Sequence, residues 1–153
     1  QKSLALPGVV ALTHLVHRLG GYVSLVSNRD GSYRDASGST LAATIANLKQ
    51  QNIVFDQVIL ANYKTSQHPS DKNPRFNAVI YGHYDSHEMV WSKRLPPHQV
   101  IAYFGDNIQD FPRFKQAAVD ALPDDSKTYE VFGAGYFILP NPMYGSWEAN
   151  RYH

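Results

Sequence analysis

Hydrophobic and polar positions follow two different periods along this chain. Apolar residues recur at helical spacing over residues 7–19 and 40–51, and short β-branched or aromatic runs typical of strands cover residues 21–26, 57–60, 100–104 and 135–139. Two more helices are predicted over residues 74–84 and 111–122, although Val79-Ile80-Tyr81 also has a strand-like pattern. Because strands and helices alternate, the pattern predicts an α/β fold with a mostly parallel sheet.

The composition is that of one globular domain, which we expect to span residues 1–153. Hydrophobic residues make up 43% of the chain, charged residues 18%, and the formal net charge is +1. These values exclude an acidic disordered tail and provide no strong basic field for a nucleic acid polymer. The absence of cysteine excludes disulfides and a thiol nucleophile. No apolar run is long enough to span a bilayer, and no signal-peptide pattern is present.

The apolar run over residues 100–104 ends abruptly in Gly105-Asp106-Asn107, and Asp110 follows. In open α/β folds ligands bind at the carboxyl ends of strands, and Asp and Asn supply the hard oxygen ligands that Mg²⁺ prefers. Gly105 would allow a sharp turn at this point. The structural alternative is an Asp-Asn turn in which Asp110 caps the next helix. The sequence therefore predicts either a metal site or a capped turn here.

Polar residues also follow the run over residues 21–26, where the chain continues as Ser27-Asn28-Arg29-Asp30. A hydroxyl and an amide at the end of a strand can hydrogen-bond phosphate oxygens. Lys72 lies in a later polar segment, and its ammonium could offset phosphate charge. The alternatives are a simple turn at residues 27–31 and a solvated surface lysine.

Taken together, these segments resemble motifs of the haloacid dehalogenase (HAD) superfamily of phosphohydrolases. The nearer resemblance is to the class C acid phosphatases, the family of bacterial outer-membrane lipoprotein 5′-nucleotidases. The similarity covers residues 5–148, and the last matching segment is the most specific to this family. The matching segments are Leu6-Pro7-Gly8, Ser27-Asn28-Arg29, Lys72 with Arg75-Phe76, Gly105 to Phe111, and Leu139-Pro140-Asn141-Pro142-Met143-Tyr144-Gly145-Ser146-Trp147-Glu148.

The resemblance implies a HAD-like Rossmannoid fold, a three-layer sandwich around the sheet. It implies that Ser27, Asn28 and Lys72 bind phosphate, with Lys72 also stabilising the transferring group. It further implies that Asp106 holds Mg²⁺ and that Asp110 is catalytic, binding water of the metal shell or bracing Lys72. In the same family, a Tyr at the position of Tyr144 stacks on a nucleoside base. The alternative for Tyr144 is that it closes the core beneath a proline-rich loop.

The first motif of the family, Asp-x-Asp, does not occur in this sequence. Its first Asp is the nucleophile of the family and its second is the general acid. Asp124 and Asp125 are adjacent rather than alternate and lie in a predicted loop. We therefore expect the chain to be the carboxyl-terminal part of a phosphatase, with the nucleophile strand and the cap region missing. An amino-terminal fragment or a second chain would supply the Asp-x-Asp, or a homo-oligomer would form through the exposed sheet edge.

The function that follows from the resemblance is Mg²⁺-dependent hydrolysis of phosphomonoesters, including 5′-nucleotides, through an aspartyl-phosphate intermediate. This chain alone is expected to be nearly inactive because it lacks the nucleophile. The alternative is a catalytically inactive, phosphatase-like binding or storage protein. The resemblance also implies an extracytoplasmic location, in the periplasm or at the outer membrane.

Two histidine-containing segments are candidates for other sites. His14 and His17 lie three positions apart on the first predicted helix and could share a metal, but no third ligand has a diagnostic spacing, which favours a surface role. The segment 82–88, Gly-His-Tyr-Asp-Ser-His-Glu, has metal-ligating residues in an order that matches no zinc-protease motif. It opens an insertion, residues 82–98, that we expect to be a polar surface loop, with Trp91 and Pro96-Pro97 packing it onto the domain.

Overall fold

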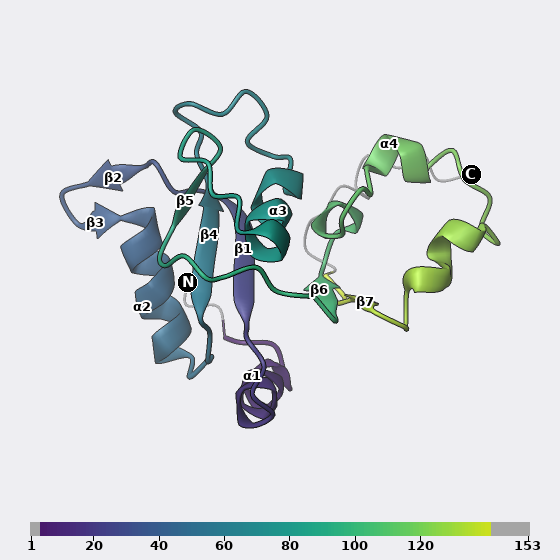
Figure 1. Cartoon of the computed structure of the whole chain (residues 1–153), viewed down its shortest axis with the longest axis horizontal. Coiled ribbons are helices and arrows are strands. Elements are labelled where there is room, and N and C mark those ends of the chain that lie inside the picture. The colour runs from purple at the N-terminus through teal and green to yellow at the C-terminus, as the bar shows by residue number, and fades with distance from the viewer. Residues whose placement is uncertain (1–3, 142–153) are drawn as a thin grey trace. The chain divides into compact units, whose positions relative to one another are not determined.

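The computed structural model describes residues 4–141, which form two compact units divided between His98 and Gln99 (Figure 1). The fold is a mixed α/β fold with small sheets. The elements of the first unit are α1 (Val9–Arg18), β1 (Ser24–Asp30), β2 (Arg34–Asp35), β3 (Gly38–Ser39), α2 (Thr40–Gln50), β4 (Gln57–Ala61), α3 (Asn73–Tyr81) and β5 (Met89–Trp91). The elements of the second unit are β6 (Tyr103–Gly105), a 3₁₀ helix (Ile108–Asp110), α4 (Gln116–Val119), a second 3₁₀ helix (Lys127–Val131) and β7 (Tyr136–Ile138).

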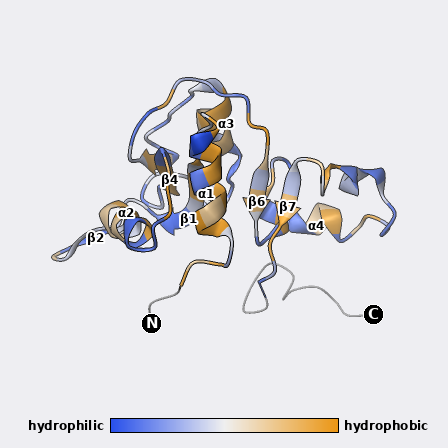
Figure 2. Cartoon of the chain, turned by 90° about the horizontal axis from the view of Figure 1, so that it is seen from below, coloured by the Kyte–Doolittle hydropathy of each residue, from blue (hydrophilic) through white to orange (hydrophobic). Residues whose placement is uncertain are grey.

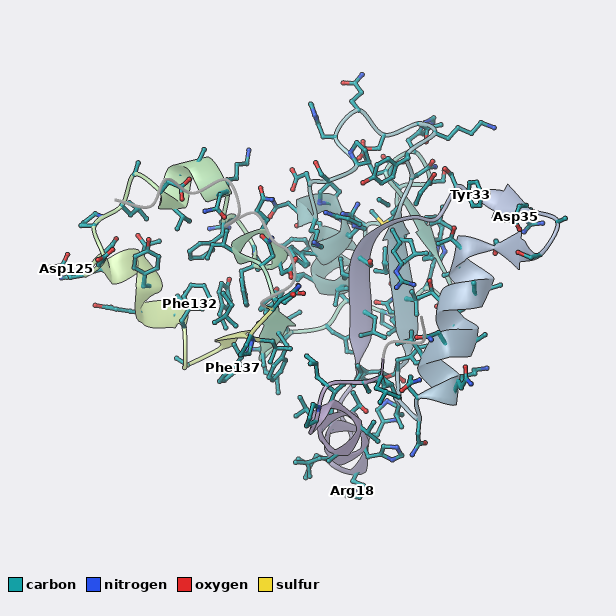
Figure 3. All side chains as sticks on the ribbon, turned by 180° about the vertical axis from the view of Figure 1, so that it is seen from behind. Arg18, Tyr33, Asp35, Asp125, Phe132 and Phe137 are labelled. Carbon is teal, nitrogen blue, oxygen red and sulfur yellow. The ribbon has the colours of Figure 1, made fainter. Side chains whose placement is uncertain are left out.

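The first unit is organised around the three-stranded sheet β1-β4-β5, in which β4 is central (Figure 1). Strand β1 pairs with β4 in parallel, whereas β5 pairs with β4 in the antiparallel direction. Helices α2 and α3 flank the sheet: α2 contacts β4, and α3 contacts both β1 and β4. The short strands β2 and β3 form a separate antiparallel hairpin that carries Tyr33 and Asp35 (Figure 3).

The core of the first unit is β4 itself. Four consecutive side chains, Val58 to Ala61, are at most 1% exposed, as expected for a strand that is covered on both faces. Ile59 packs with Ala78 of α3 and Met89 of β5, and Trp91 covers this cluster. The end of β1 approaches β4 closely, because a Cβ placed on Gly31 would lie 2.9 Å from the Leu60 Cβ.

The mostly parallel sandwich predicted from the sequence is not confirmed. The β1–β4 and β6–β7 pairs are parallel, but β4–β5 and β2–β3 are antiparallel.

The prediction that residues 82–98 form a polar surface loop is wrong for Met89–Trp91, which form strand β5. Met89 is 1% exposed, so burial of its side chain against Ile59 outweighs the polar composition of the surrounding segment.

The predicted helices are confirmed in the first unit, and α3 excludes the alternative strand at residues 79–81. Helix α1 carries both hydrophobic and hydrophilic residues around its turns (Figure 2). Its predicted apolar face is incompletely covered, since Leu15 and Leu19 are exposed. No helix within residues 4–141 has the length and apolar character needed to cross a membrane.

His14 and His17 both hold α1 against the segment between α2 and β4. His14 Nε2 lies 3.2 Å from the carbonyl oxygen of Asn52, and His17 Nε2 lies 2.7 Å from Asp56 Oδ2. The same Asp56 oxygen accepts a hydrogen bond from the backbone N–H of Val23, just before β1. The two histidines are therefore half-buried anchors of α1 rather than freely solvated surface residues.

The predicted helix 111–122 is much shorter in the structure, where only Gln116–Val119 is α-helical. The residues before it explain the difference. Pro112 follows Phe111 directly, and Arg113 has a φ of 69°, which a right-handed helix does not tolerate. The strand predicted at residues 100–104 is likewise shorter, because its pairing with β7 begins at Tyr103.

Candidate active site

The end of β1 departs from regular pairing at the predicted phosphate-binding residues. Ser27 is paired with Leu60, but the next paired residue of β1 is Asp30, opposite Ala61, so Asn28 and Arg29 lie in an irregularity of the ladder. Irregularities of this kind redirect side chains and are common beside active sites. The Ser27 hydroxyl accepts a hydrogen bond from the backbone N–H of Arg29 at 3.2 Å, which holds the bend.

The side-chain amide of Asn28 is fixed at both ends. Its Nδ2 donates to the carbonyl oxygen of Ser70 at 3.1 Å, and its Oδ1 accepts a hydrogen bond from the guanidinium of Arg75. Arg75 also donates to the carbonyl oxygen of Pro69 at 3.1 Å. These bonds join β1 to the segment that leads into α3. Asn28 thus lies next to the polar segment in which Lys72 was predicted to act.

Lys72 occupies the capping position at the start of α3. Its carbonyl oxygen accepts the first helical hydrogen bond, from Phe76 N at 2.9 Å, and Pro74 lies in the first turn. The preceding Asp71 accepts hydrogen bonds from the backbone N–H and the side-chain amide of Asn73 at 2.9 and 2.7 Å. Lys72 is therefore held on a defined turn, two residues after the carbonyl group that binds Asn28.

The carboxylate of Asp30 stabilises the turn that follows β1. Desolvation raises the pKa of this carboxyl. Hydrogen bonds from the hydroxyl and backbone N–H of Ser32 and from the backbone N–H of Tyr63 lower the pKa by more than desolvation raises it, so it lies below its ordinary value. Asp30 thus carries a stabilised negative charge and links the end of β1 to the segment after β4.

Residues 105–110, the predicted metal-binding segment, form a compact loop at the end of β6. Asp110 Oδ2 accepts hydrogen bonds from the backbone N–H groups of Asp106 and Asn107 at 3.0 and 3.1 Å, and the Asn107 side chain accepts one from Gln109 N. This reciprocal pattern is a capping box around the 3₁₀ helix Ile108–Asp110. A Cβ on Gly105 would lie 2.3 Å from the Asp110 Cβ, so the loop requires glycine at this position.

The alternative that Asp110 is a capping residue thus describes its geometry. Asp110 caps the turn formed by residues 106–110, which precedes it, rather than the next helix. The catalytic role predicted for Asp110 remains a prediction.

Asp106 has a different environment. Its Oδ2 accepts a hydrogen bond of 2.7 Å from Nδ2 of Asn141, which follows β7. A backbone bond of 2.7 Å from Leu139 N to the Gly105 oxygen holds the two segments together.

Two residues of these networks were missed as site residues by the sequence analysis. Arg75 and Asn141 both lie in segments that carry the family resemblance, but no role was assigned to either. The spacing of Arg75 from Lys72 was a usable signal, because three positions on a helix place a side chain on the neighbouring turn. The spacing could not show that the arginine is buried beneath Asn28.

The described residues alone do not make a complete magnesium site. No group of three or more His, Asp or Glu side chains within residues 4–141 is placed to hold a metal ion. Both carboxylates of this loop have the donor chemistry that Mg²⁺ prefers, but Asp106 Oδ2 accepts a hydrogen bond from Asn141 and Asp110 Oδ2 accepts two from the backbone. Any such site would need further oxygen ligands beyond these residues.

A cavity of about 550 Å³ in the second unit is lined by Ile108, which lies between Asp106 and Asp110, and by residues of the segment 129–138. Its lining is mostly apolar and includes Phe132 and Phe137, which are labelled in Figure 3. Phe132 belongs to an aromatic group in which Phe111 stacks on Tyr136 with ring centroids 5.2 Å apart. Within residues 4–141, the side chains of the predicted site residues do not line this cavity.

The predicted site residues fall into both units. The first unit contains Ser27, Asn28 and Lys72, and the hydrogen bond from Asn28 to the Ser70 carbonyl joins the end of β1 to the segment that carries Lys72. Asp106 and Asp110 belong to the second unit and share one loop. Tyr144 lies outside the described residues.

Comparison with known families agrees with these motifs. The family described as HAD superfamily, subfamily IIIB (acid phosphatase) matches residues 1–147. The chain belongs to this family. Its members are acid phosphatases, which are hydrolases of phosphomonoesters, and the match supports phosphatase activity as the general function. No solved structure gives a significant match to the chain.

Proposed function

We propose that this chain forms the phosphate-binding part of a Mg²⁺-dependent acid phosphatase whose nucleophile lies on a segment outside this sequence. The observation that carries the proposal is the family match over residues 1–147, which includes every candidate site residue. The sequence contains no Asp-x-Asp, so the nucleophile and the general acid must come from elsewhere if the chain takes part in catalysis.

The proposed reaction has two steps. A carboxylate of the supplied Asp-x-Asp attacks phosphorus, the ester P–O bond breaks, and the second Asp protonates the departing alkoxide. Water then cleaves the aspartyl-phosphate, which releases inorganic phosphate and restores the carboxylate. In both steps negative charge on the phosphoryl oxygens must be stabilised, because an anionic nucleophile approaches an anionic group.

The residues of this chain would supply that stabilisation. The Ser27 hydroxyl and the Asn28 amide would act as neutral donors on an irregular strand end, and Lys72, on the turn that begins α3, would add a positive charge. Asp106 would contribute one oxygen ligand to Mg²⁺, with the remaining carboxylates coming from the supplied segment. Bound Mg²⁺ would offset the charge between the phosphate and the nucleophile. Asp110 would keep the Asp106 loop in shape through its two backbone hydrogen bonds.

The substrates would be small phosphomonoesters, with 5′-nucleotides included through stacking of a base on Tyr144. A single aromatic side chain also accepts aryl phosphates, since stacking depends on a flat apolar face rather than on one pattern of hydrogen bonds. The extracytoplasmic location implied by the resemblance is part of the same proposal.

Strand edges and exposed apolar side chains support a partner segment. Among the described strands β1 pairs with β4 alone and β6 with β7 alone, so each has an unpaired edge. The first unit exposes Leu15 and Leu19, and the second exposes Ile101 and Ile138. Open edges accept an added strand through backbone hydrogen bonds. The proposed occupant is a segment that carries Asp-x-Asp; a second copy of this chain is the alternative.

The test is complementation. The chain is mixed with a polypeptide containing an Asp-x-Asp strand, and hydrolysis of p-nitrophenyl phosphate is followed with Mg²⁺ at mildly acidic pH. We expect activity in the mixture and not in either part, and a loss of at least about a hundredfold with Lys72→Met. Asp124→Asn, in an exposed loop, is the matched control that keeps its activity. A folded mixture that binds phosphate without hydrolysing esters would instead support the inactive binding or storage protein.

A further inference from the structure

Arg75 is a buried cation without a matching buried anion. Its side chain is 1% exposed and is the largest fully buried side chain among the described residues. Its hydrogen-bond acceptors are neutral, the side-chain oxygen of Asn28 and the carbonyl oxygen of Pro69. No carboxylate of residues 4–141 forms a salt bridge with it, and its Nε has no hydrogen-bond partner among them. Burying a guanidinium in this way is costly, so packing alone does not account for an arginine here.

The electrostatic environment of Arg75 is only partly compensated. Burial lowers the pKa of Arg75, while the negative charges of Asp71 and Glu88 and the Tyr63 side chain oppose that change. A guanidinium nonetheless stays charged at any ordinary pH. A positive charge in a poorly solvated region attracts an anion more strongly than the same charge in water. The charge lies one hydrogen bond away from Asn28, a residue of the proposed phosphate site.

The hydrogen bond from Arg75 also decides which way the Asn28 amide faces. An asparagine amide carries one acceptor oxygen and one NH₂ group with two hydrogens. Arg75 binds the oxygen, and the NH₂ group gives one hydrogen to the Ser70 carbonyl. The second NH₂ hydrogen is not used in these two bonds and can be donated to another acceptor. A flipped amide would place its NH₂ against the guanidinium, where two donors would face each other.

The same bonds close a ring around the start of α3. Asn28 binds Ser70, Arg75 binds Pro69 and Asn28, and Arg75 itself lies on α3 three positions after Lys72. A displacement of Arg75 would therefore release Asn28 and also loosen the turn that carries Lys72.

We propose that Arg75 is a positioning residue of the phosphate site, which holds the Asn28 amide with an N–H directed to the anion. This inference rests on the proposed function. In it, Arg75 determines phosphate affinity by orienting Asn28 and does not contact the anion itself. The chemistry would favour any tetrahedral oxyanion over a neutral ligand.

The first experiment measures binding of inorganic phosphate to the full chain by isothermal titration calorimetry, in a double-mutant cycle. Arg75→Lys keeps the charge but not the planar geometry, and Asn28→Ala removes the amide. Each change is expected to weaken phosphate binding roughly tenfold, as for the loss of one charge-assisted hydrogen bond. Because Arg75 acts through Asn28, the double variant should lose little more than either single variant. Arg34→Lys, on the exposed β2–β3 hairpin, is the matched control and should bind as the unchanged chain does.

The outcomes separate the two proposals. If the unchanged chain binds phosphate and Lys72→Met weakens this binding, the phosphate site stands. Unchanged affinity of folded Arg75→Lys would then overturn the role of Arg75 alone. Fully additive losses would also overturn it, because they would show that Arg75 does not act through Asn28. If the unchanged chain fails to bind phosphate at all, the proposed function fails first and the inference fails with it.

A second measurement needs no substitution and covers the case in which Arg75→Lys does not fold. In ¹⁵N NMR spectra of the unchanged chain, the Asn28 amide hydrogen bonded to Ser70 should exchange slowly with water, and the other should shift when phosphate is added. The exposed Asn47 provides the reference for a freely exchanging amide. Exchange at Asn28 as fast as at Asn47, or no shift with phosphate, would overturn the inference.

Discussion

The first unit buries a whole strand, whereas the described part of the second unit buries a single large side chain. In the first unit, β4 lies between two strands and its side chains Val58 to Ala61 are almost entirely inaccessible. In the second unit, Phe111 is 1% exposed, while its aromatic neighbours Phe132 and Tyr136 remain half-exposed. The two units therefore hold their candidate site residues by different means.

In the first unit, long-range packing holds the site. Asn28 and Lys72 are far apart in sequence, and they approach because β1 and α3 both pack on β4. In the second unit, mostly local hydrogen bonds hold it, since Asp110 binds the N–H groups of Asp106 and Asn107 within one turn. Core substitutions should therefore disturb the first part of the site, and loop geometry should control the second.

The largest expected effect is on the core of the first unit. Ile59→Ala should lower the free energy of unfolding by about 2–5 kcal/mol, because it leaves a cavity against Ala78 and Met89. Ile101→Ala in the second unit is the matched control, since Ile101 is 84% exposed and should change stability by less than about 0.5 kcal/mol. Urea unfolding followed by circular dichroism measures both. Equal losses would remove the distinction between the two units.

An intermediate effect is expected in the loop of the second unit. Gly105→Ala should cost about 1–3 kcal/mol, because its new methyl group would overlap Asp110 and force the loop to shift. Phosphatase activity of the complemented chain should fall with it, since the loop carries Asp106. Gly135→Ala is the control, where the nearest atom, the Ile101 oxygen, lies 3.7 Å from the added carbon. If Gly105→Ala behaved like Gly135→Ala in both assays, local geometry would not govern this part of the site.

The smallest expected effect concerns acid stability at the end of β1. The pKa of Asp30 in the folded chain lies below its ordinary value of 3.8, so the ionised carboxylate stabilises the fold above that pH. This contribution is lost as the pH falls through the lowered pKa. Asp30→Asn should therefore lose less stability between pH 5 and pH 3 than the unchanged chain does, as measured by urea midpoints. Asp124→Asn should follow the unchanged chain, and a steeper loss in Asp30→Asn would contradict the prediction.

Much of the first unit could be predicted from the sequence, because its elements have a clear local period. Helix α2 spans Thr40–Gln50 against a predicted 40–51, and β4 spans Gln57–Ala61 against a predicted 57–60. Strand β5 was missed since its three residues lie in a segment rich in polar side chains, and its burial comes from contact with β4. The length of α4 was overestimated because apolar residues after Phe111 recur at helical spacing, whereas Pro112 and the positive φ of Arg113 delay the start of the helix to Gln116.

The sequence by itself determined the chemistry available to this protein: a family of acid phosphatases, the Ser27, Asn28, Lys72, Asp106 and Asp110 side chains, and the absence of an Asp-x-Asp pair. These features are carried by residue identity and spacing, which do not depend on how the chain packs. Tertiary structure alone decided that Arg75 is buried beneath Asn28 and that Asn141 binds Asp106. Both contacts join residues more than thirty positions apart, and no local period of hydrophobic and polar residues records such a pairing.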